Sequence, residues 1–223
     1  MAKPTHDARV PADVAKAAAV YTPFALSFYD VVVHGLSNRF AWRCPTERLI
    51  DLYRSNLSSN HLEAGVGTGL FIDRVADADL RRLVLLDINL NCLARAGRRL
   101  ARFAPVSLQA NLLEPLGPHM APFDSVALTY VLHCLPGAMV AKLKVIDHLR
   151  PLMREGAVLF GATILGRGIT PSPAAKALLG LYNAKGIFNN EADDYATLEA
   201  GLRQRFQTVT IESEGCVALF RAR

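Results

Sequence analysis

The sequence predicts an α/β protein, a three-layer sandwich in which helices cover both faces of a seven-stranded, mostly parallel sheet. Short apolar runs alternate with longer segments of helical periodicity, as expected for parallel strands joined by helices. The length of 223 residues suits one domain with a modest extension. With 51% hydrophobic and 20% charged residues the chain can bury a substantial core, which excludes a disordered protein.

Seven apolar runs are predicted to form the strands. In chain order they cover residues 60–64, 82–87, 106–110, 125–132, 157–164, 207–212 and 217–221. Only residues 213–215 separate the last two runs, which is too short for a crossover helix. We therefore expect these two strands to form an antiparallel hairpin at the end of an otherwise parallel sheet.

Helical periodicity predicts helices between the strands and before them. The clearest segments between strands cover residues 70–76, 89–103 and 138–153. Two further helical segments, 14–33 and 45–57, precede the first strand. The chain is thus divided into an N-terminal helical extension, residues 1–56, predicted to lie as a lid beside the carboxyl edge of the sheet, and a second unit, residues 57–223.

Charge and cysteine usage exclude several classes of protein. The net charge of +5 permits an acidic partner but does not require one. The four cysteines include no Cys-x-x-Cys pair, so their spacing indicates neither a disulfide scaffold nor a metal site. No apolar run approaches the ~18 residues of a membrane span, and no signal peptide is evident. We expect a cytoplasmic protein that does not contact a membrane and binds no metal.

A glycine-rich turn follows the first predicted strand and opens a helix. Gly65, Gly67 and Gly69 fall where a ligand would cross the sheet edge, and glycine lets the backbone approach a ligand closely. A phosphate-binding P-loop needs Lys followed by Ser or Thr after its last glycine, where this chain has Leu70 and Phe71. A dinucleotide-binding motif needs glycine at position 70, so that interpretation is weakened.

Two acidic residues accompany the turn. Glu63 precedes Gly65 by two positions, and its charge repels phosphate but suits a cationic amino-acid group. Asp87 ends the second predicted strand, where a carboxylate can accept both hydroxyls of a ribose. Together they favour a nucleoside that bears a positive group and no pyrophosphate. S-adenosylmethionine fits that description.

Four segments in order resemble the successive motifs of class I S-adenosylmethionine-dependent methyltransferases, whose fold is Rossmann-like. They are Glu-Ala-Gly-Val-Gly-Thr-Gly at 63–69, Leu-Leu-Asp-Ile-Asn at 85–89, Gln-Ala-Asn-Leu at 109–112 and Phe-Asp-Ser-Val-Ala-Leu-Thr-Tyr-Val-Leu-His at 123–133. The terminal hairpin agrees with the reversed seventh strand of this family. Taken singly, each motif also has a structural explanation, such as helix packing for Gly69, a helix cap for Asp87 or a turn for Asn111.

The resemblance implies a set of cofactor contacts. The residues concerned are Glu63, Gly65, Gly67, Gly69, Asp87, Ile88, Asn111, Leu112 and Tyr130. Glu63 would organise the contacts to the methionine part, and Asp87 would bind the ribose. Asn111 would meet the amino edge of adenine, where family members commonly carry Asp, although an amide oxygen can also accept that hydrogen bond. The backbone near Tyr130 would face the sulfonium.

Methyl transfer from a sulfonium is an in-line displacement, so positioning can supply much of the catalysis. A general base is needed only for an acceptor that arrives protonated, and His133 is the first choice for it. The alternative role for His133 is to fix the loop after the fourth strand. The predicted substrate-binding residues are Tyr21, Tyr29, Trp42, Arg43 and Tyr182. The alternative for the aromatic ones is packing within the core.

The expected activity is methyl transfer to a small organic molecule, a secondary metabolite or biosynthetic intermediate, by a monomer or homodimer. S-adenosyl-L-homocysteine would be the second product. A stripe of arginines, Arg95, Arg98, Arg99 and Arg102, has the spacing of one helix face, which is usually solvated. An RNA or DNA methyltransferase would use such a stripe for binding. No nucleic-acid partner is favoured, because the chain lacks the Asn/Asp-Pro-Pro-Tyr signature and a separate binding module. A non-catalytic scaffold that binds the cofactor is the other alternative.

Overall fold

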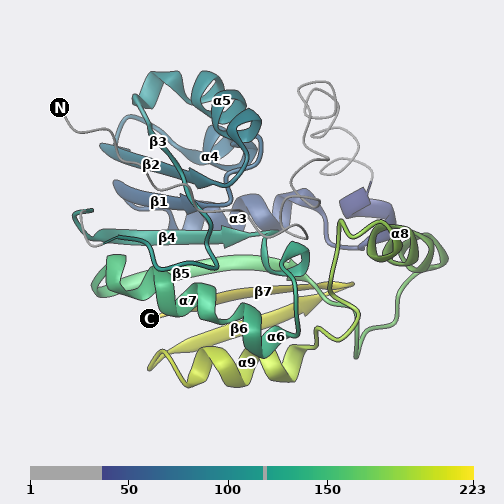
Figure 1. The fold of residues 1–223 in the computed structure, drawn as a ribbon. Coiled ribbons are helices and arrows are strands. Elements are labelled where there is room, and N and C mark those ends of the chain that lie inside the picture. The colour runs from purple at the N-terminus through teal and green to yellow at the C-terminus, as the bar shows by residue number, and fades with distance from the viewer. Residues whose placement is uncertain (1–36, 118–119) are drawn as a thin grey trace.

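The computed structural model describes residues 37–117 and 120–223 (Figure 1). Their seven strands form one sheet in the order β3-β2-β1-β4-β5-β7-β6. The strands are β1 (Asn60–Ala64), β2 (Arg82–Asp87), β3 (Val106–Gln109), β4 (Phe123–Thr129), β5 (Met153–Ile164), β6 (Val209–Glu214) and β7 (Val217–Ala222). Strands β1 to β5 are parallel, and β7 is antiparallel to both β5 and β6. The predicted mostly parallel sheet with an antiparallel end is confirmed.

Helices cover both faces of this sheet, which makes the sandwich three layers thick (Figure 1). One face packs against α3 (Thr46–Asn56), α4 (Leu70–Val75), α5 (Leu90–Arg99) and α8 (Pro173–Ala184). The other face packs against α6 (Met139–Lys142), α7 (Lys144–Leu149) and α9 (Tyr195–Arg203). Three short 3₁₀ helices, η2 (Ala101–Phe103), η3 (Leu132–Cys134) and η4 (Arg150–Leu152), complete the connections. None of the helices in the described ranges is long and apolar enough to cross a membrane.

Side-chain caps explain where several helices begin. The side chain of Asn89 accepts a hydrogen bond from the backbone N–H of Asn91 at the start of α5. Ser172 caps α8 in the same way, and Pro173 follows at the first helical position, where its missing N–H costs nothing. Asp194 caps α9 through the N–H of Thr197.

The elements differ from the predicted ones in several places. β4 ends at Thr129 and not at residue 132, because Tyr130 has a positive φ of 59° that leaves the extended region. The helix predicted over 138–153 is divided at Leu143, whose carbonyl accepts from Ile146 in a tightened turn. β5 begins at Met153, four residues early, and neither α8 nor α9 was among the predicted helices.

The strand order reverses between β1 and β4. β2 and β3 lie on one side of β1, while β4, β5 and the antiparallel hairpin lie on the other. In open α/β sheets a ligand binds beyond the carboxyl ends of the strands at such a reversal. The fold therefore predicts a ligand site at the carboxyl ends of β1, β2, β3 and β4.

Candidate active site

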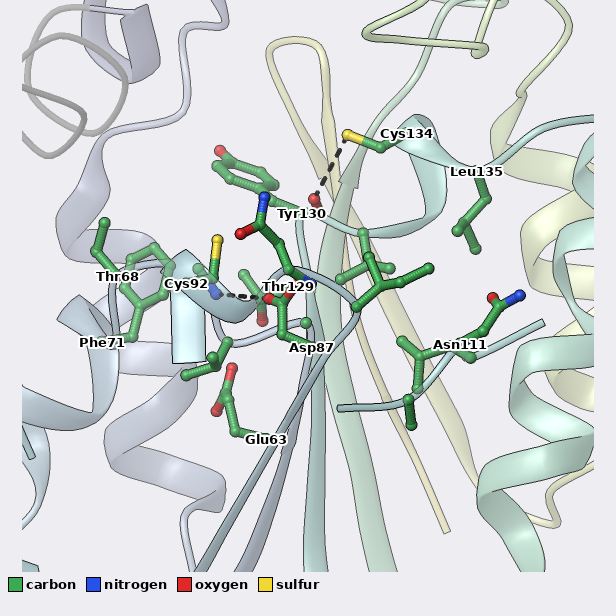
Figure 2. Close-up of a pocket in the computed structure, with 18 of the residues that line it drawn as sticks. Glu63, Thr68, Phe71, Asp87, Cys92, Asn111, Thr129, Tyr130, Cys134 and Leu135 are labelled. Carbon is green, nitrogen blue, oxygen red and sulfur yellow. Dashed lines mark hydrogen bonds between the residues drawn. The ribbon is translucent and has the colours of Figure 1, made fainter. Parts of the chain in front are cut away.

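A pocket opens at the carboxyl ends of these four strands (Figure 2). It encloses about 990 Å³ of space, part of it open to solvent. Eight of the nine predicted cofactor residues line it: Glu63, Gly65, Gly67, Asp87, Ile88, Asn111, Leu112 and Tyr130. In Figure 2, Thr68 and Phe71 lie on one side of the pocket and Asn111 and Leu135 on the other.

The glycine turn after β1 needs its glycines for two different reasons. A Cβ on Gly65, which has a φ of +78°, would lie 2.2 Å from Cγ2 of Val131, so the absence of a side chain lets the two loops meet. A Cβ on Gly69 would lie 3.2 Å from Cβ of Ala96 in α5. Gly69 is not among the residues that line the pocket. Its position agrees with a role in packing against helix α5.

Asp87, at the end of β2, is held by two backbone donors. Its Oδ2 accepts from the N–H of Gly67 over 3.2 Å, and its Oδ1 accepts from the N–H of Asn89 over 2.9 Å. Burial raises the pKa of this carboxyl to about 6, although the backbone donors oppose the shift. The carboxylate thereby links the glycine turn to the start of α5 while it faces the pocket (Figure 2).

Glu63 is 4% exposed and reaches the pocket from the end of β1. Its Oε1 accepts from the hydroxyl of Tyr53 in α3 over 2.5 Å. Its Oε2 lies 3.1 Å from Nε2 of His61. Burial, with the adjacent Glu63 charge, raises the pKa of Tyr53 well above its ordinary value, so the phenol stays protonated as a donor. Neither Tyr53 nor His61 is among the site residues predicted from the sequence.

The pocket fits S-adenosylmethionine by its charge and by its shape. Within the described ranges, Glu63 and Asp87 are the only charged side chains that line it, and both are acidic. An acidic pocket favours a sulfonium cation and disfavours a pyrophosphate. A Cβ at Gly67 would meet nothing within 4 Å, so the turn leaves space for a ligand. The described part of the chain holds no group of three His, Cys, Asp or Glu side chains that could bind a metal ion.

Asn111 lies at the β3 end of the pocket, and its side chain already has partners. Its Oδ1 accepts from the N–H of Leu113 over 3.1 Å, and its Nδ2 donates to Oε1 of Glu114 over 3.2 Å. This is the geometry of a turn residue. Asn111 lines the pocket beside the apolar side chain of Leu112.

His133 is buried away from the pocket. It is 3% exposed and is not among the residues that line the pocket. Its Nδ1 accepts from the backbone N–H of Ile164 over 3.3 Å, and its ring meets Phe188 edge-on at 4.5 Å. Burial, with the nearby Lys142 charge, lowers the pKa of the imidazole to about 3. This placement suits the role of fixing the loop and does not favour the role of general base.

The three predicted substrate residues within the described ranges do not line the pocket. Trp42 is 1% exposed and lies in the core, where its carbonyl accepts from the N–H of Cys216. Arg43 is exposed beside the hairpin turn at Gly215. Tyr182 packs against Phe188 at 5.0 Å and does not line the pocket. Tyr21 and Tyr29 lie outside the described residues.

A buried ion pair fixes the segment after α8 to the pocket wall. Nζ of Lys142 contacts Oδ2 of Asp193 at 2.6 Å and donates to the carbonyl of Asn189 over 2.7 Å. The N–H of Asn189 in turn donates to the carbonyl of His133 over 2.8 Å. The next residue, Cys134, lines the pocket beside Tyr130 (Figure 2). The ion pair therefore supports this wall from behind.

Two of the four arginines predicted to form a stripe are engaged within the fold. Arg99 donates to the carbonyl of Thr68 over 3.0 Å, and Arg102 donates to Oδ1 of Asp73 over 2.6 Å. Both contacts tie α5 and η2 to the α4 region. A role in structure accounts for these two side chains without a nucleic acid.

The sheet with its reversed last strand, the glycine turn after β1 and the carboxylate at the end of β2 define a class I S-adenosylmethionine-dependent methyltransferase. Residues 62–159 match the family described as a methyltransferase domain. The chain is 36% identical over 222 residues to demethylluteothin O-methyltransferase of Streptomyces thioluteus, a match that covers 98% of this chain and 95% of that enzyme. The chain belongs to this methyltransferase family.

Two further similarities agree with this conclusion. The physcion biosynthesis cluster O-methyltransferase of Aspergillus chevalieri is 35% identical over 206 residues, which cover 92% of this chain and 93% of the relative. Among solved structures, the N-methyltransferase NodS of Bradyrhizobium japonicum WM9, in complex with S-adenosyl-L-homocysteine, has a TM-score of 0.62 and 16% identity. The match covers 90% of this chain and 96% of NodS, and shows a shared fold.

Proposed function

We propose that this enzyme transfers a methyl group from S-adenosylmethionine to a hydroxyl oxygen of a small organic molecule, a secondary metabolite or its precursor. The observation that carries the proposal is the acidic pocket at the strand reversal, built from Glu63 and Asp87. The relatives named as O-methyltransferases, similar over nearly the whole chain, support oxygen as the atom methylated.

The cofactor would lie along the ends of the strands in the order of the sheet. Asp87 would accept the ribose hydroxyls, while Ile88 and Leu112 would pack against the adenine and Asn111 would meet its amino edge. Glu63, on the next strand, would face the amino-acid end. The chemistry supplied by the bound cofactor is an activated methyl group on a sulfonium. Residues of the chain exclude water and align the acceptor oxygen with that methyl carbon.

The acceptor would approach the wall formed by Tyr130, Cys134 and Leu135 after β4. This wall lies beyond Glu63, at the β4 end of the pocket. Tyr130 and Leu135 present apolar surface there, which suits an organic molecule with an aromatic or otherwise flat apolar part. His133 would hold this wall in place and would transfer no proton.

An assay with methyl-deuterated S-adenosylmethionine tests the proposal. The enzyme is incubated with a panel of phenols and enols and with an extract of the producing cells, and labelled products are identified by mass spectrometry. We expect the label on an oxygen, and Asp87→Ala to abolish it because the ribose contact is lost. Absence of S-adenosylhomocysteine binding in calorimetry would overturn the proposal, as would label on nitrogen or on nucleic acid.

We also propose a cytoplasmic location and a monomeric or homodimeric state. The four cysteines, Cys44, Cys92, Cys134 and Cys216, are all free thiols, which suits a reducing compartment. Burial raises the pKa of Cys44 to about 12, so this thiol is unreactive at neutral pH. Light scattering of the purified protein would establish the number of subunits.

A further inference from the structure

The hydroxyl of Tyr53 lies between two strands that form the pocket. It donates to Oε1 of Glu63 on β1 over 2.5 Å, and the hydroxyl oxygen of Tyr53 lies 3.1 Å from Oγ1 of Thr129 on β4. Glu63 and Thr129 both line the pocket, as Figure 2 shows, whereas Tyr53 itself does not. The ring is 0% exposed and is stacked on Phe71 at 5.1 Å and meets Phe160 edge-on at 5.0 Å.

The second oxygen of Glu63 is held from the opposite side. Nε2 of His61 lies 3.1 Å from Oε2, and Nδ1 of the same ring lies 2.7 Å from Oγ of Ser125. An ionised carboxylate can only accept, so Nε2 of His61 is the donor in the contact with Glu63. The His61 ring stacks on Phe160 and is fully buried. Packing thus fixes both donors.

Two fixed donors, one on each oxygen, leave the Glu63 carboxylate a single orientation. A buried carboxylate that lost one of these donors would keep an unsatisfied oxygen and could turn toward another partner. Donors that are locked by packing are the usual way in which a binding side chain is pre-organised. The pair of Tyr53 and His61 therefore has the geometry of a support for a ligand contact.

The position of Glu63 along the sheet indicates which part of the ligand this support affects. The pocket passes from Asn111 after β3, to Asp87 on β2, to Glu63 on β1 and Thr129 on β4. With the ribose at Asp87 and the base toward β3, the amino-acid end falls at Glu63. This step rests on the proposed function.

We infer that Tyr53 and His61 are positioning residues that hold the Glu63 carboxylate for the amino-acid part of the cofactor. Affinity for that part then depends on the Tyr53 hydroxyl, and affinity for the nucleoside part does not. Two ligands separate these parts: S-adenosylhomocysteine carries the amino acid, and 5′-methylthioadenosine lacks it. Both carry the ribose that Asp87 would bind.

Calorimetry with these two ligands tests the inference on the intact protein. Tyr53→Phe keeps the stacked ring and removes only the hydroxyl. We expect it to weaken the binding of S-adenosylhomocysteine about tenfold, which is the effect of losing one hydrogen bond to a charged group. The affinity for 5′-methylthioadenosine should change less than about twofold. In a Glu63→Gln background the same substitution should have little further effect on the affinity for S-adenosylhomocysteine, because the carboxylate that the Tyr53 hydroxyl supports is gone.

Tyr195→Phe is the matched control. The Tyr195 hydroxyl donates to the carbonyl of Ile211 over 2.9 Å, between α9 and β6, so this variant also loses one tyrosine hydrogen bond but far from the pocket. It should leave the affinities for both ligands unchanged. If Tyr53→Phe weakened the binding of both ligands equally, its role would be merely structural. If it weakened the binding of neither ligand, the hydroxyl would have no role in binding. Each result overturns the inference.

A second variant covers the case in which Tyr53→Phe does not fold. His61→Phe keeps a flat ring against Phe160 and removes the donor to Oε2, and the same selective loss of S-adenosylhomocysteine affinity is expected. An unselective loss, or unfolding of both variants while Tyr195→Phe stays folded, would assign this network to stability and reject the inference. Failure of the wild-type protein to bind either ligand would instead overturn the proposed function and the inference with it.

Discussion

The hydroxyl of Tyr130 donates a hydrogen bond of 2.9 Å to Oδ1 of Asn38, a residue 92 positions earlier. Asn38 is fully buried, and its Nδ2 donates to Oγ1 of Thr46 at the start of α3. Tyr130 has a φ of 59°, a left-handed conformation that costs a non-glycine residue about 1 kcal/mol or more. The side-chain bond helps to hold this strained residue at the edge of the pocket.

Removing either partner of this bond should destabilise the fold. We expect Tyr130→Phe to lower the free energy of unfolding by about 1–2 kcal/mol, because the buried Oδ1 of Asn38 loses its donor. Asn38→Ala should have a similar effect, and the double variant should lose less than the sum. Urea denaturation of the four proteins measures this coupling. Strictly additive effects would contradict a direct contact in solution.

The pKa of Asp87 predicts a pH dependence of cofactor binding. The carboxyl titrates near pH 6, and its ionised form is the better acceptor for ribose hydroxyls. Affinity for S-adenosylhomocysteine should therefore be full above pH 7 and fall as the pH drops through 6, reaching about tenfold weaker near pH 5. Calorimetry between pH 5 and 8 measures the change. Asp87→Asn should bind more weakly and show no such dependence; an unaltered slope in this variant would assign the titration to another group.

The same shift has a definite sign for stability in the absence of ligand. The folded pKa of about 6 lies above the value of 3.8 for an exposed Asp, so between these values the folded chain binds the proton more readily than the unfolded chain. This group therefore makes the fold less stable as the pH rises from about 4 to 6. Asp87→Asn should remove this contribution in thermal unfolding measured across that range.

His133 should contribute no limb to the pH profile of methyl transfer. With a pKa of about 3 its imidazole is neutral from pH 5 to 9, because it is buried. We expect His133→Asn to lower turnover by loosening the wall after β4, while the shape of the rate profile stays that of the wild type. Initial rates over this range decide the matter. Loss of a wild-type limb near pH 6.5 would show that His133 does take the proton.

Much of this fold is predictable because its signals are local. Alternating strands and helices, the glycine turn and the acidic residues at strand ends all appear within short windows of sequence. Helix α9 also carried such a signal, since Asp194 is a cap and Leu198 and Leu202 lie on one face, but this signal was missed.

The parts of the site that escaped prediction depend on long-range packing. Tyr53 reads as an ordinary apolar position of an amphipathic helix, and nothing local places its hydroxyl beside Thr129, 76 positions away. His133 follows β4 as expected, but Phe188 and Asn189 cover it from a distant segment. Trp42 is drawn into the core by the hairpin turn at Cys216. Sequence spacing alone cannot reveal which side of a loop such residues face.

The contact between Gly65 and Val131 gives a prediction with a built-in rescue. Gly65→Ala should lower the free energy of unfolding by about 2–3 kcal/mol, since its Cβ would fall 2.2 Å from Cγ2 of Val131 at a φ of +78°. Adding Val131→Ala should recover part of the loss. Gly67→Ala, with a φ of +54° and an open surrounding, should cost only about 1 kcal/mol. Equal effects of the two alanines in thermal unfolding would contradict this account.

The buried pair of Lys142 and Asp193 should be far more sensitive than an exposed pair. Lys142→Met should destabilise the protein by about 3–5 kcal/mol, because it leaves a buried carboxylate without its cation. Lys142→Met with Asp193→Leu should recover much of that loss. Arg203→Ala breaks the exposed pair with Glu199 and should cost about 0.5 kcal/mol or less. Guanidinium denaturation compares the three variants, and a loss from Lys142→Met as small as the control would exclude an ion pair.

The last strand of the chain completes a part of the fold that begins much earlier. β7 covers the edge of β5, and the hairpin turn before β7 supplies the N–H of Cys216 to the carbonyl of Trp42. During synthesis, therefore, neither the edge of β5 nor the backbone around Trp42 can reach its final partner until β7 and the turn before it have left the ribosome. Until then the long apolar strand β5 has an open edge, which is the kind of surface that pairs with other chains.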